Sequence, residues 1–128
     1  MKLRKSYTCP LELVHDIVRG KWKTILIFQM RNEGCSFSAL QHSISGISQK
    51  VLLEQLGELR QVGLVDKISA PGFPLRVEYF LTERGREMLA AVEIMQKLGA
   101  EYIAEKEMAE SAQEGESTAR LPDAQKSK

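Results

Sequence analysis

Apolar residues recur at helical spacing through the first half of the chain. Pro10 suits the first turn of a helix, and Gly20 interrupts the apolar pattern that follows it. A second helix comes directly after, and a short third helix and a fourth helix begin near Ser38 and Ser48, their predicted N-caps. Gly63 ends the fourth helix, because glycine readily takes the left-handed conformation found at helix C-termini. The pattern therefore predicts four consecutive helices.

The pattern then changes to a period of two, which is typical of strands. Apolar residues alternate with others over residues 75–81, and residues 64–69 provide the partner strand. Pro71 and Gly72 lie between the two strands and fit a type II turn. Thr82 is the predicted N-cap of a long helix that ends near Lys106.

The order of these elements predicts a mainly α fold of the α+β kind. A short turn that contains Gly46 joins the third and fourth helices, which is the helix-turn-helix pattern. The two-stranded hairpin directly after the fourth helix forms a β wing. The predicted fold is a winged helix-turn-helix with a long C-terminal helix for dimerisation.

The fourth helix is the candidate recognition helix. Its apolar positions share one face, on which it would pack against the preceding helices, and its opposite face is polar and free to enter a DNA major groove. Ser48, Gln49 and Lys50 lie at its N-terminal end. A glutamine can read adenine, a lysine can reach guanine or a phosphate, and a serine can bond to either kind of group. The alternative is a polar helix face that is simply solvated.

Other residues of this face are also candidate DNA contacts. Glu54 and Arg60 are polar, whereas Leu53 is apolar. The side chain of Leu53 either contacts a thymine methyl group or is an ordinary exposed leucine, and the residues do not decide between the two. Gly57 costs about 1 kcal/mol of helix stability relative to alanine, and the sequence gives no reason for it.

The remaining candidate DNA contacts lie outside this helix. Lys67 and Arg76 are on the two strands of the wing, where they could hold flanking phosphates or enter the minor groove. The alternative is an edge strand that charge keeps soluble. Ser38 begins the third helix, and Lys23 lies at the start of the second, where a lysine either clamps the DNA backbone or is plain surface.

The long C-terminal helix carries an apolar stripe that is wider than one small core requires. The stripe includes Met88, Val92, Met95, Leu98 and Tyr102. A second copy of the same surface would cover the excess, and a twofold homodimer would set two recognition helices about 34 Å apart on a palindromic site. The alternative is a helix that packs only on the first two helices of its own chain.

Composition places the chain among globular proteins. It has 128 residues, of which 43% are hydrophobic, and no apolar run approaches the roughly 20 residues that a membrane span needs. Charged and polar residues from Glu12 to Asp16 interrupt the stretch after the basic N-terminus, so we expect no signal peptide. Two cysteines are too few for a disulfide framework, and the expected location is the cytoplasm.

The formal net charge of +1 argues at first against a nucleic-acid-binding protein. Its distribution removes this objection. Residues 1–86 contain 13 basic and 8 acidic residues, whereas residues 87–128 contain 5 basic and 9 acidic residues. We expect a basic arm over residues 1–8, the winged helix-turn-helix domain with its dimerisation helices over residues 9–107, and a disordered acidic and polar tail over residues 108–128.

The cysteines and histidines form no catalytic or metal-binding pattern. His15 and His42 are far apart in the sequence, the two cysteines are not a CxxC pair, and no glycine-rich phosphate loop is present. We therefore expect neither enzyme activity nor a cofactor nor a bound metal. Cys9 stands just before Pro10 with basic residues upstream, and such surroundings stabilise a thiolate that can sense oxidants. The alternative is an unremarkable small residue.

Three runs of sequence resemble the HxlR-type winged-helix transcriptional regulators, which are relatives of the MarR-type proteins. The runs are CPLELVHDIVRGKWKTILIFQM, FSALQHSISGISQKVLLEQLGELRQVGLVDK and VEYFLTERGREM, and the match extends from about Cys9 to Glu105. The resemblance implies a homodimer that binds operator DNA through the helix opened by GISQK and through its wing. It also implies a dimer interface built by the first and last helices, which adds Leu11 and Val14 to the stripe above.

The resemblance further implies that Cys9 is the thiol that answers electrophiles or oxidants, because several members carry a cysteine at that place. Two departures concern the recognition helix. Members often have a basic residue where this chain has Gly57 and a small polar residue where it has Leu53. The operator sequence therefore cannot be transferred from relatives.

The sequence thus predicts a dimeric, sequence-specific repressor or activator that acts on a palindromic operator and responds to thiol chemistry at Cys9. Two alternatives stay open. The first is a regulator that responds to a small-molecule ligand bound between the DNA-binding part and the dimer helices, with Cys9 inert. The second is a protein-interaction adaptor on the same fold that has lost DNA binding.

Overall fold

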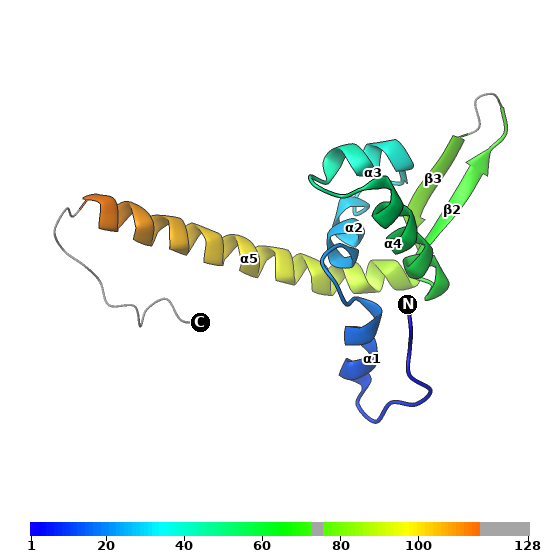
Figure 1. The fold of residues 1–128 in the computed structure, drawn as a ribbon, viewed down its shortest axis with the longest axis horizontal. Coiled ribbons are helices and arrows are strands. Elements are labelled where there is room, and N and C mark those ends of the chain that lie inside the picture. Colours follow the sequence, from blue (N-terminus) through cyan, green and yellow to red (C-terminus); the bar gives the residue numbers. More distant parts are fainter. Residues whose placement is uncertain (73–75, 116–128) are drawn as a thin grey trace. The chain divides into compact units, whose positions relative to one another are not determined.

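The computed structural model describes residues 1–72 and 76–115. The chain divides into two compact units, residues 1–93 and residues 94–128. The elements in the described residues are α1 (Pro10–Ile17), α2 (Lys23–Gln29), β1 (Cys35–Ser36), α3 (Phe37–Ser43), α4 (Gln49–Gln61), β2 (Val65–Ala70), β3 (Arg76–Leu81) and α5 (Glu83–Gly115) (Figure 1). This order confirms the predicted winged helix-turn-helix fold, and α5 continues from the first unit into the second.

The core of the first unit lies among α2, α3, α4 and the sheet. The fourth helix buries residues at the spacing that its apolar pattern predicted, namely Leu52, Leu56 and Leu59. These side chains pack with residues of α2 and α3 that are equally buried, namely Leu26, Ile27, Met30 and Leu40. Each fully buried leucine contributes about 1.5–3 kcal/mol relative to an exposed one, so this cluster fixes which face of α4 points inward.

The wing belongs to a three-stranded antiparallel sheet with the order β1-β3-β2. Lys67 of β2 lies opposite Tyr79 of β3, and Cys35 of β1 pairs with Tyr79 from the other side. The predicted hairpin is confirmed, but β1 was not predicted. Two residues are too short to show an alternation of polar and apolar positions. The residue at 75 and part of the predicted turn lie outside the described residues.

Serine side chains cap α3 and α4. The Oγ of Ser48 accepts a hydrogen bond from the backbone N–H of Val51 at 3.1 Å, as predicted. The predicted N-cap of α3 was wrong, because Ser36 rather than Ser38 accepts the corresponding bond from Ala39 N–H. Ser38 is instead an exposed residue in the first turn of α3.

The start of α5 packs closely against the loop after α4. Thr82 Oγ1 donates to the carbonyl oxygen of Gly63 at 2.5 Å and accepts from Gly85 N–H at 3.0 Å. A Cβ atom at Gly85 would overlap the carbonyl oxygen of Leu64, so only glycine permits this approach. Gly63 itself has a φ of 80°, which is the left-handed conformation predicted for the end of α4.

The long helix extends beyond its predicted end. It continues to Gly115, so the predicted end near residue 106 was wrong. Residues 108–115 are helical, although disorder was predicted for them. Residues 116–128 lie outside the described residues. The added turns contain mostly Glu, Ala, Met and Gln, which favour helix by intrinsic propensity although their side chains are exposed. Within the described residues, no helix has both the length and the apolar character needed to span a membrane.

Candidate nucleic-acid interface

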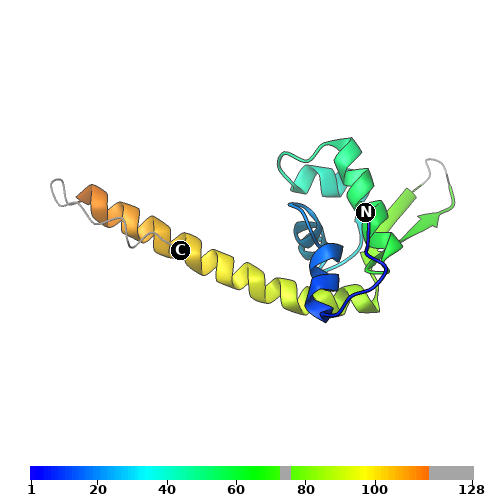
Figure 2. The same ribbon diagram turned by 60° about the horizontal axis from the view of Figure 1, so that its bottom comes forward.

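Buried residues fix the turn between α3 and α4. Gly46 takes a φ of 88°, a left-handed conformation that favours glycine, and Ile44 and Ile47 on either side of it are buried. α2 packs against both α3 and α4, and β2 packs against α4. Figures 1 and 2 show the resulting arrangement, in which the β2–β3 hairpin stands next to α4. The turn therefore holds α4 at a defined angle beside the wing.

The face of α4 opposite the core is exposed along the whole helix. The exposed residues are the predicted DNA contacts and their neighbours, namely Ser48, Gln49, Lys50, Leu53, Glu54, Gly57, Arg60 and Gln61. Arg60 lies 3.6 Å from Asp66 at the start of the wing, a weak pairing at the surface that leaves the guanidinium accessible. The sequence therefore identified correctly which residues of α4 reach solvent.

The structure does not place Lys23 at this surface. Its side chain is buried, and its Nζ donates to Oε1 of Glu58 on α4 at 2.5 Å. The prediction that Lys23 contacts DNA was wrong, because its side chain is almost fully buried and its ammonium group is already paired with Glu58. This pair holds the pKa of Glu58 below its ordinary value, mainly through the hydrogen bond from Lys23.

The wing brings two other predicted contacts to one groove. Ser38 at the start of α3 and Arg76 on β3 line an open groove of about 830 Å³ between α3 and the hairpin. Both residues are exposed, and so is Lys67 on β2. α3, β2 and β3 thus present a hydroxyl group and two cationic groups on the surface of the first unit. Hydroxyl and cationic groups are the kinds of group that bind phosphates.

The two cysteines have different surroundings. Cys9 is exposed and is the N-cap residue of α1, where its side chain makes no capping hydrogen bond. Cys35 is half-buried, and its Sγ lies 3.7 Å from the carbonyl oxygen of Gln29 and 3.6 Å from that of Glu33. Burial raises the pKa of the Cys35 thiol, and the nearby carboxylates of Glu33 and Glu78 raise it further. Cys35 is therefore held in the thiol form, which is the less reactive one.

Comparison with known proteins identifies the family. The family model described as HxlR-like helix-turn-helix matches residues 17–107. The chain belongs to the HxlR-like helix-turn-helix family. A curated relative, the uncharacterized HTH-type transcriptional regulator YkvN of Bacillus subtilis, is 33% identical over 110 residues, which cover 86% of this chain and 92% of YkvN.

Two solved structures resemble this HxlR-like chain. The redox regulator HypR in its reduced form aligns with a TM-score of 0.71 at 33% identity, covering 80% of this chain and 99% of HypR. The transcriptional regulator YodB from B. subtilis in its reduced form aligns with a TM-score of 0.63 at 32% identity, covering 71% of this chain and 90% of YodB. YodB has also been solved after treatment with diamide. The HxlR-like chain is accordingly a transcriptional regulator with a helix-turn-helix fold, and regulators of this kind are not enzymes.

The apolar residues predicted for a dimer interface divide into two groups. In the first unit of the HxlR-like chain, Leu11 and Val14 of α1 are exposed. Val92, by contrast, is 4% exposed within the core of its own unit, and Met88 is half-buried against that core. The prediction that Val92 faces a partner was wrong, because its side chain is buried by its own chain. For the half-buried Met88 it stays a prediction.

The second unit of the HxlR-like chain leaves the rest of the stripe uncovered. Met95, Leu98 and Tyr102 are exposed, as predicted. Further large apolar side chains of α5 are exposed as well, namely Ile94, Ile103 and Met108. Contiguous apolar surface that stays exposed is typical of interaction sites.

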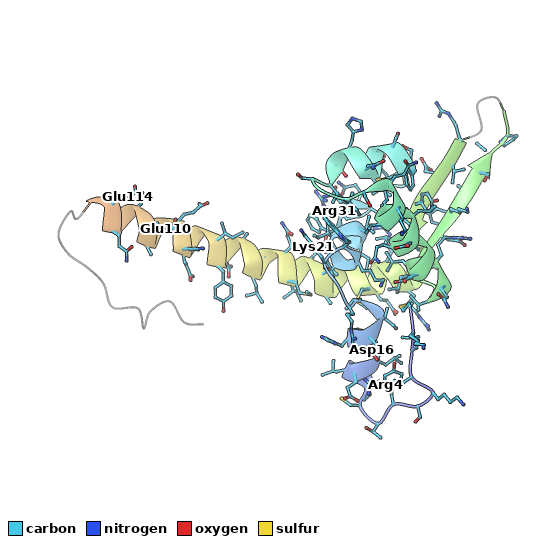
Figure 3. All side chains as sticks on the ribbon, viewed as in Figure 1. Arg4, Asp16, Lys21, Arg31, Glu110 and Glu114 are labelled. Carbon is cyan, nitrogen blue, oxygen red and sulfur yellow. The ribbon has the colours of Figure 1, made fainter. Side chains whose placement is uncertain are left out.

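One polar cluster at α1 was missed by sequence reasoning. Asp16 accepts hydrogen bonds from Tyr7 Oη at 2.7 Å, Arg19 Nη2 at 2.8 Å and Arg4 Nε at 3.2 Å. Figure 3 shows Arg4 beside Asp16. The hydrogen bond from Tyr7 is the main reason that the pKa of Asp16 is lowered. The cluster ties the N-terminal arm to α1.

The second missed residue is Glu58, which pairs with Lys23 across 35 positions of sequence. No local signal indicates such a pairing, because helical periodicity relates only residues three or four apart.

Within the described residues, no group of histidine, cysteine or acidic side chains could hold a metal ion.

Proposed function

We propose that this HxlR-like regulator binds operator DNA as a homodimer and reads its sequence with α4 in the major groove. The observation that carries the proposal is the exposed polar face of α4, which begins at a capped N-terminus and lies beside the wing. In helix-turn-helix proteins the N-terminal residues of the second helix contact base edges. Gln49 and Lys50 occupy that end, with Ser48 as its cap.

Within this proposal the residues have two kinds of role. Gln49 reads a base, because its amide can donate to and accept from the edge of adenine. Lys50, Arg76, Lys67 and Ser38 neutralise or bond phosphates, which positions the protein without selecting a sequence. A twofold dimer presents two copies of α4, so the matching operator is a palindrome with half-sites about one DNA turn apart.

The test is duplex binding measured by fluorescence anisotropy over a range of salt concentrations. The duplex is selected from a random-sequence pool. We expect binding to weaken steeply as salt rises, and Lys50→Ala to reduce the slope of log K against log salt by about 1 per protomer while weakening all sequences alike. Gln49→Ala should instead reduce discrimination against one changed base pair by about tenfold, which is within the range for one bidentate contact.

Lys106→Ala is the matched control for the lysine, because Lys106 is also exposed but lies far along α5. It should leave the salt dependence unchanged. The proposal fails if no duplex is enriched at low salt, or if Gln49→Ala and Lys50→Ala both bind as the wild type does.

Oxidation of Cys9 is the second part of the proposal. The supporting observations are the exposure of Cys9, the half-buried and hydrogen-bonded state of Cys35, and the similarity to the redox regulator HypR. Cys9 also precedes the exposed apolar residues of α1, so a modification there would act at the proposed dimer surface.

Diamide treatment tests this part, because diamide takes two electrons and two protons from a pair of thiols and leaves a disulfide, which here would join the Cys9 sulfurs of the two protomers. We expect diamide to release the wild type and Cys35→Ser from the operator and to leave Cys9→Ser bound. Release should reverse on addition of dithiothreitol. Equal release of Cys9→Ser and wild type would contradict a sensing role for Cys9 while leaving the DNA-binding proposal intact.

A further inference from the structure

Leu53 and Gly57 lie on the part of α4 that faces solvent, one helical turn apart. The side chain of Leu53 is 58% exposed, although it lies in the middle of a helix whose other leucines are buried. Gly57 is exposed too, and a Cβ atom built there would meet no atom within 4 Å. Nothing within the described chain therefore requires glycine at this position.

Glycine is nevertheless costly at this site. It lowers the stability of a helix interior relative to alanine, and here no positive φ and no close contact offsets that cost. A helical side chain covers the surface one turn toward the N-terminus of its own Cα. A side chain at position 57 would therefore lie over the turn that contains Leu53. The absence of a side chain at position 57 leaves Leu53 exposed. It also lets another molecule come close to the backbone of α4 at this turn.

The charge of this stretch indicates what it can contact. From Leu53 to Gly57 the helix contains one carboxylate, Glu54, and no cation. A carboxylate repels phosphates and no cation of this stretch offsets it, so the middle of α4 is not suited to the DNA backbone. It is suited to the floor of the major groove, where the thymine methyl is the apolar group that a base edge presents.

We propose that Leu53 reads a thymine by contacting its C5 methyl group, and that Gly57 permits the close approach of α4 that this contact needs. The inference rests on the proposed function, since it requires α4 to lie in the major groove. It adds a preference for thymine at a defined position of each half-site. Gln49, Leu53 and Gly57 then form one stripe along the helix, with a hydrogen-bonding residue followed by an apolar one.

Replacing thymidine by deoxyuridine at single positions of the selected operator tests the contact, because only the methyl group is lost. At one position in each half-site, we expect uracil to weaken binding by the wild type about threefold to tenfold. Leu53→Ala should bind the thymine and uracil duplexes equally, with an affinity near that of the wild type on uracil.

Ile68→Ala is the matched control, because Ile68 on the wing is exposed to the same extent, 59%, but is not on α4. The loss caused by uracil should be unchanged in this variant. For Gly57→Ala we expect a higher midpoint of urea unfolding together with operator binding at least tenfold weaker than wild type. Binding to random-sequence duplex should stay within twofold, because phosphate contacts do not depend on position 57.

The outcomes separate this inference from the function on which it rests. If the wild type shows no preference for any duplex, the proposed function fails and this inference with it. If the wild type binds its operator but no uracil substitution weakens binding, or the loss persists in Leu53→Ala, the inference is overturned and the proposed function stands. Wild-type operator affinity in Gly57→Ala would overturn the role given to the glycine.

Discussion

Lys23 shows how a single buried charge connects the scaffold to the candidate DNA-binding helix. Its side chain is 4% exposed, and its hydrogen-bonding partner is Glu58, near the C-terminal end of α4. The amino group of Met1 lies 3.0 Å from the other carboxylate oxygen of Glu58. Packing of its leucines determines which face of α4 is buried. The ion pair joins the edge of that face to Lys23 at the start of α2. Loss of the carboxylate would leave a buried ammonium group without a partner.

Glu58→Gln should therefore destabilise the protein at neutral pH. We expect a loss of about 1–3 kcal/mol, between the values for exposed and buried ion pairs, because Glu58 itself is partly exposed. The pKa of Glu58 is lowered in the folded state, so its stabilising effect is complete above the unfolded-state value of about 4.3 and disappears as pH falls through the lower folded-state value. The difference between wild type and Glu58→Gln should accordingly shrink on acidification below about pH 4.

Urea unfolding of both proteins at pH 7 and at lower pH values measures this difference. Glu54→Gln is the matched control, because it removes the same charge from an exposed position of the same helix. If Glu58→Gln is no less stable than Glu54→Gln at pH 7, the ion pair with Lys23 does not hold α4 in place.

At the scale of elements, the sequence predicted the helix-turn-helix because each of its helices carries an apolar face at regular spacing. The exposed face of α4 followed from the same pattern, since residues that do not pack must reach solvent. The strand β1 escaped prediction because its two residues are defined by pairing with β3 and not by any local pattern. The end of α5 was misplaced because low apolar content was read as disorder, whereas its residues favour helix on their own.

Predictions about individual side chains failed where a distant segment decides burial. Lys23 looked like a surface residue because its partner on α4 is remote in sequence. The apolar stripe of α5 looked uniform, yet Val92 is covered by its own unit while Leu98 is exposed. Periodicity shows that a face is apolar, but it does not show which surface covers it.

The whole molecule combines a basic part with an acidic one. Residues 1–86 carry an excess of lysine and arginine, and residues 87–128 carry an excess of acidic residues, including Glu110 and Glu114 near the end of α5 (Figure 3). A duplex attracts the first part and repels the second. The net charge of +1 is therefore compatible with a DNA-binding surface in the first unit and an uncovered apolar stripe in the second.

A homodimer is the partner that this stripe predicts, and a single charge on the stripe should disrupt it. In the second unit Leu98 and Tyr102 lie one turn apart, and both are exposed. Leu98→Glu should shift the sedimentation coefficient at micromolar concentration from that of two chains to that of one, because burying a carboxylate in an apolar interface is strongly unfavourable. Operator affinity should fall by at least tenfold, since one protomer contacts only one half-site.

Ala100→Glu is the matched control, because helical spacing places Ala100 on the side of α5 opposite Leu98 and Tyr102. This variant introduces the same charge and should remain a dimer with wild-type affinity for the operator. A wild type that sediments as one chain would contradict the homodimer. A Leu98→Glu variant that remains a dimer would show instead that the exposed stripe of α5 is not the interface, and it would leave α1, with Leu11 and Val14, as the surface to test next.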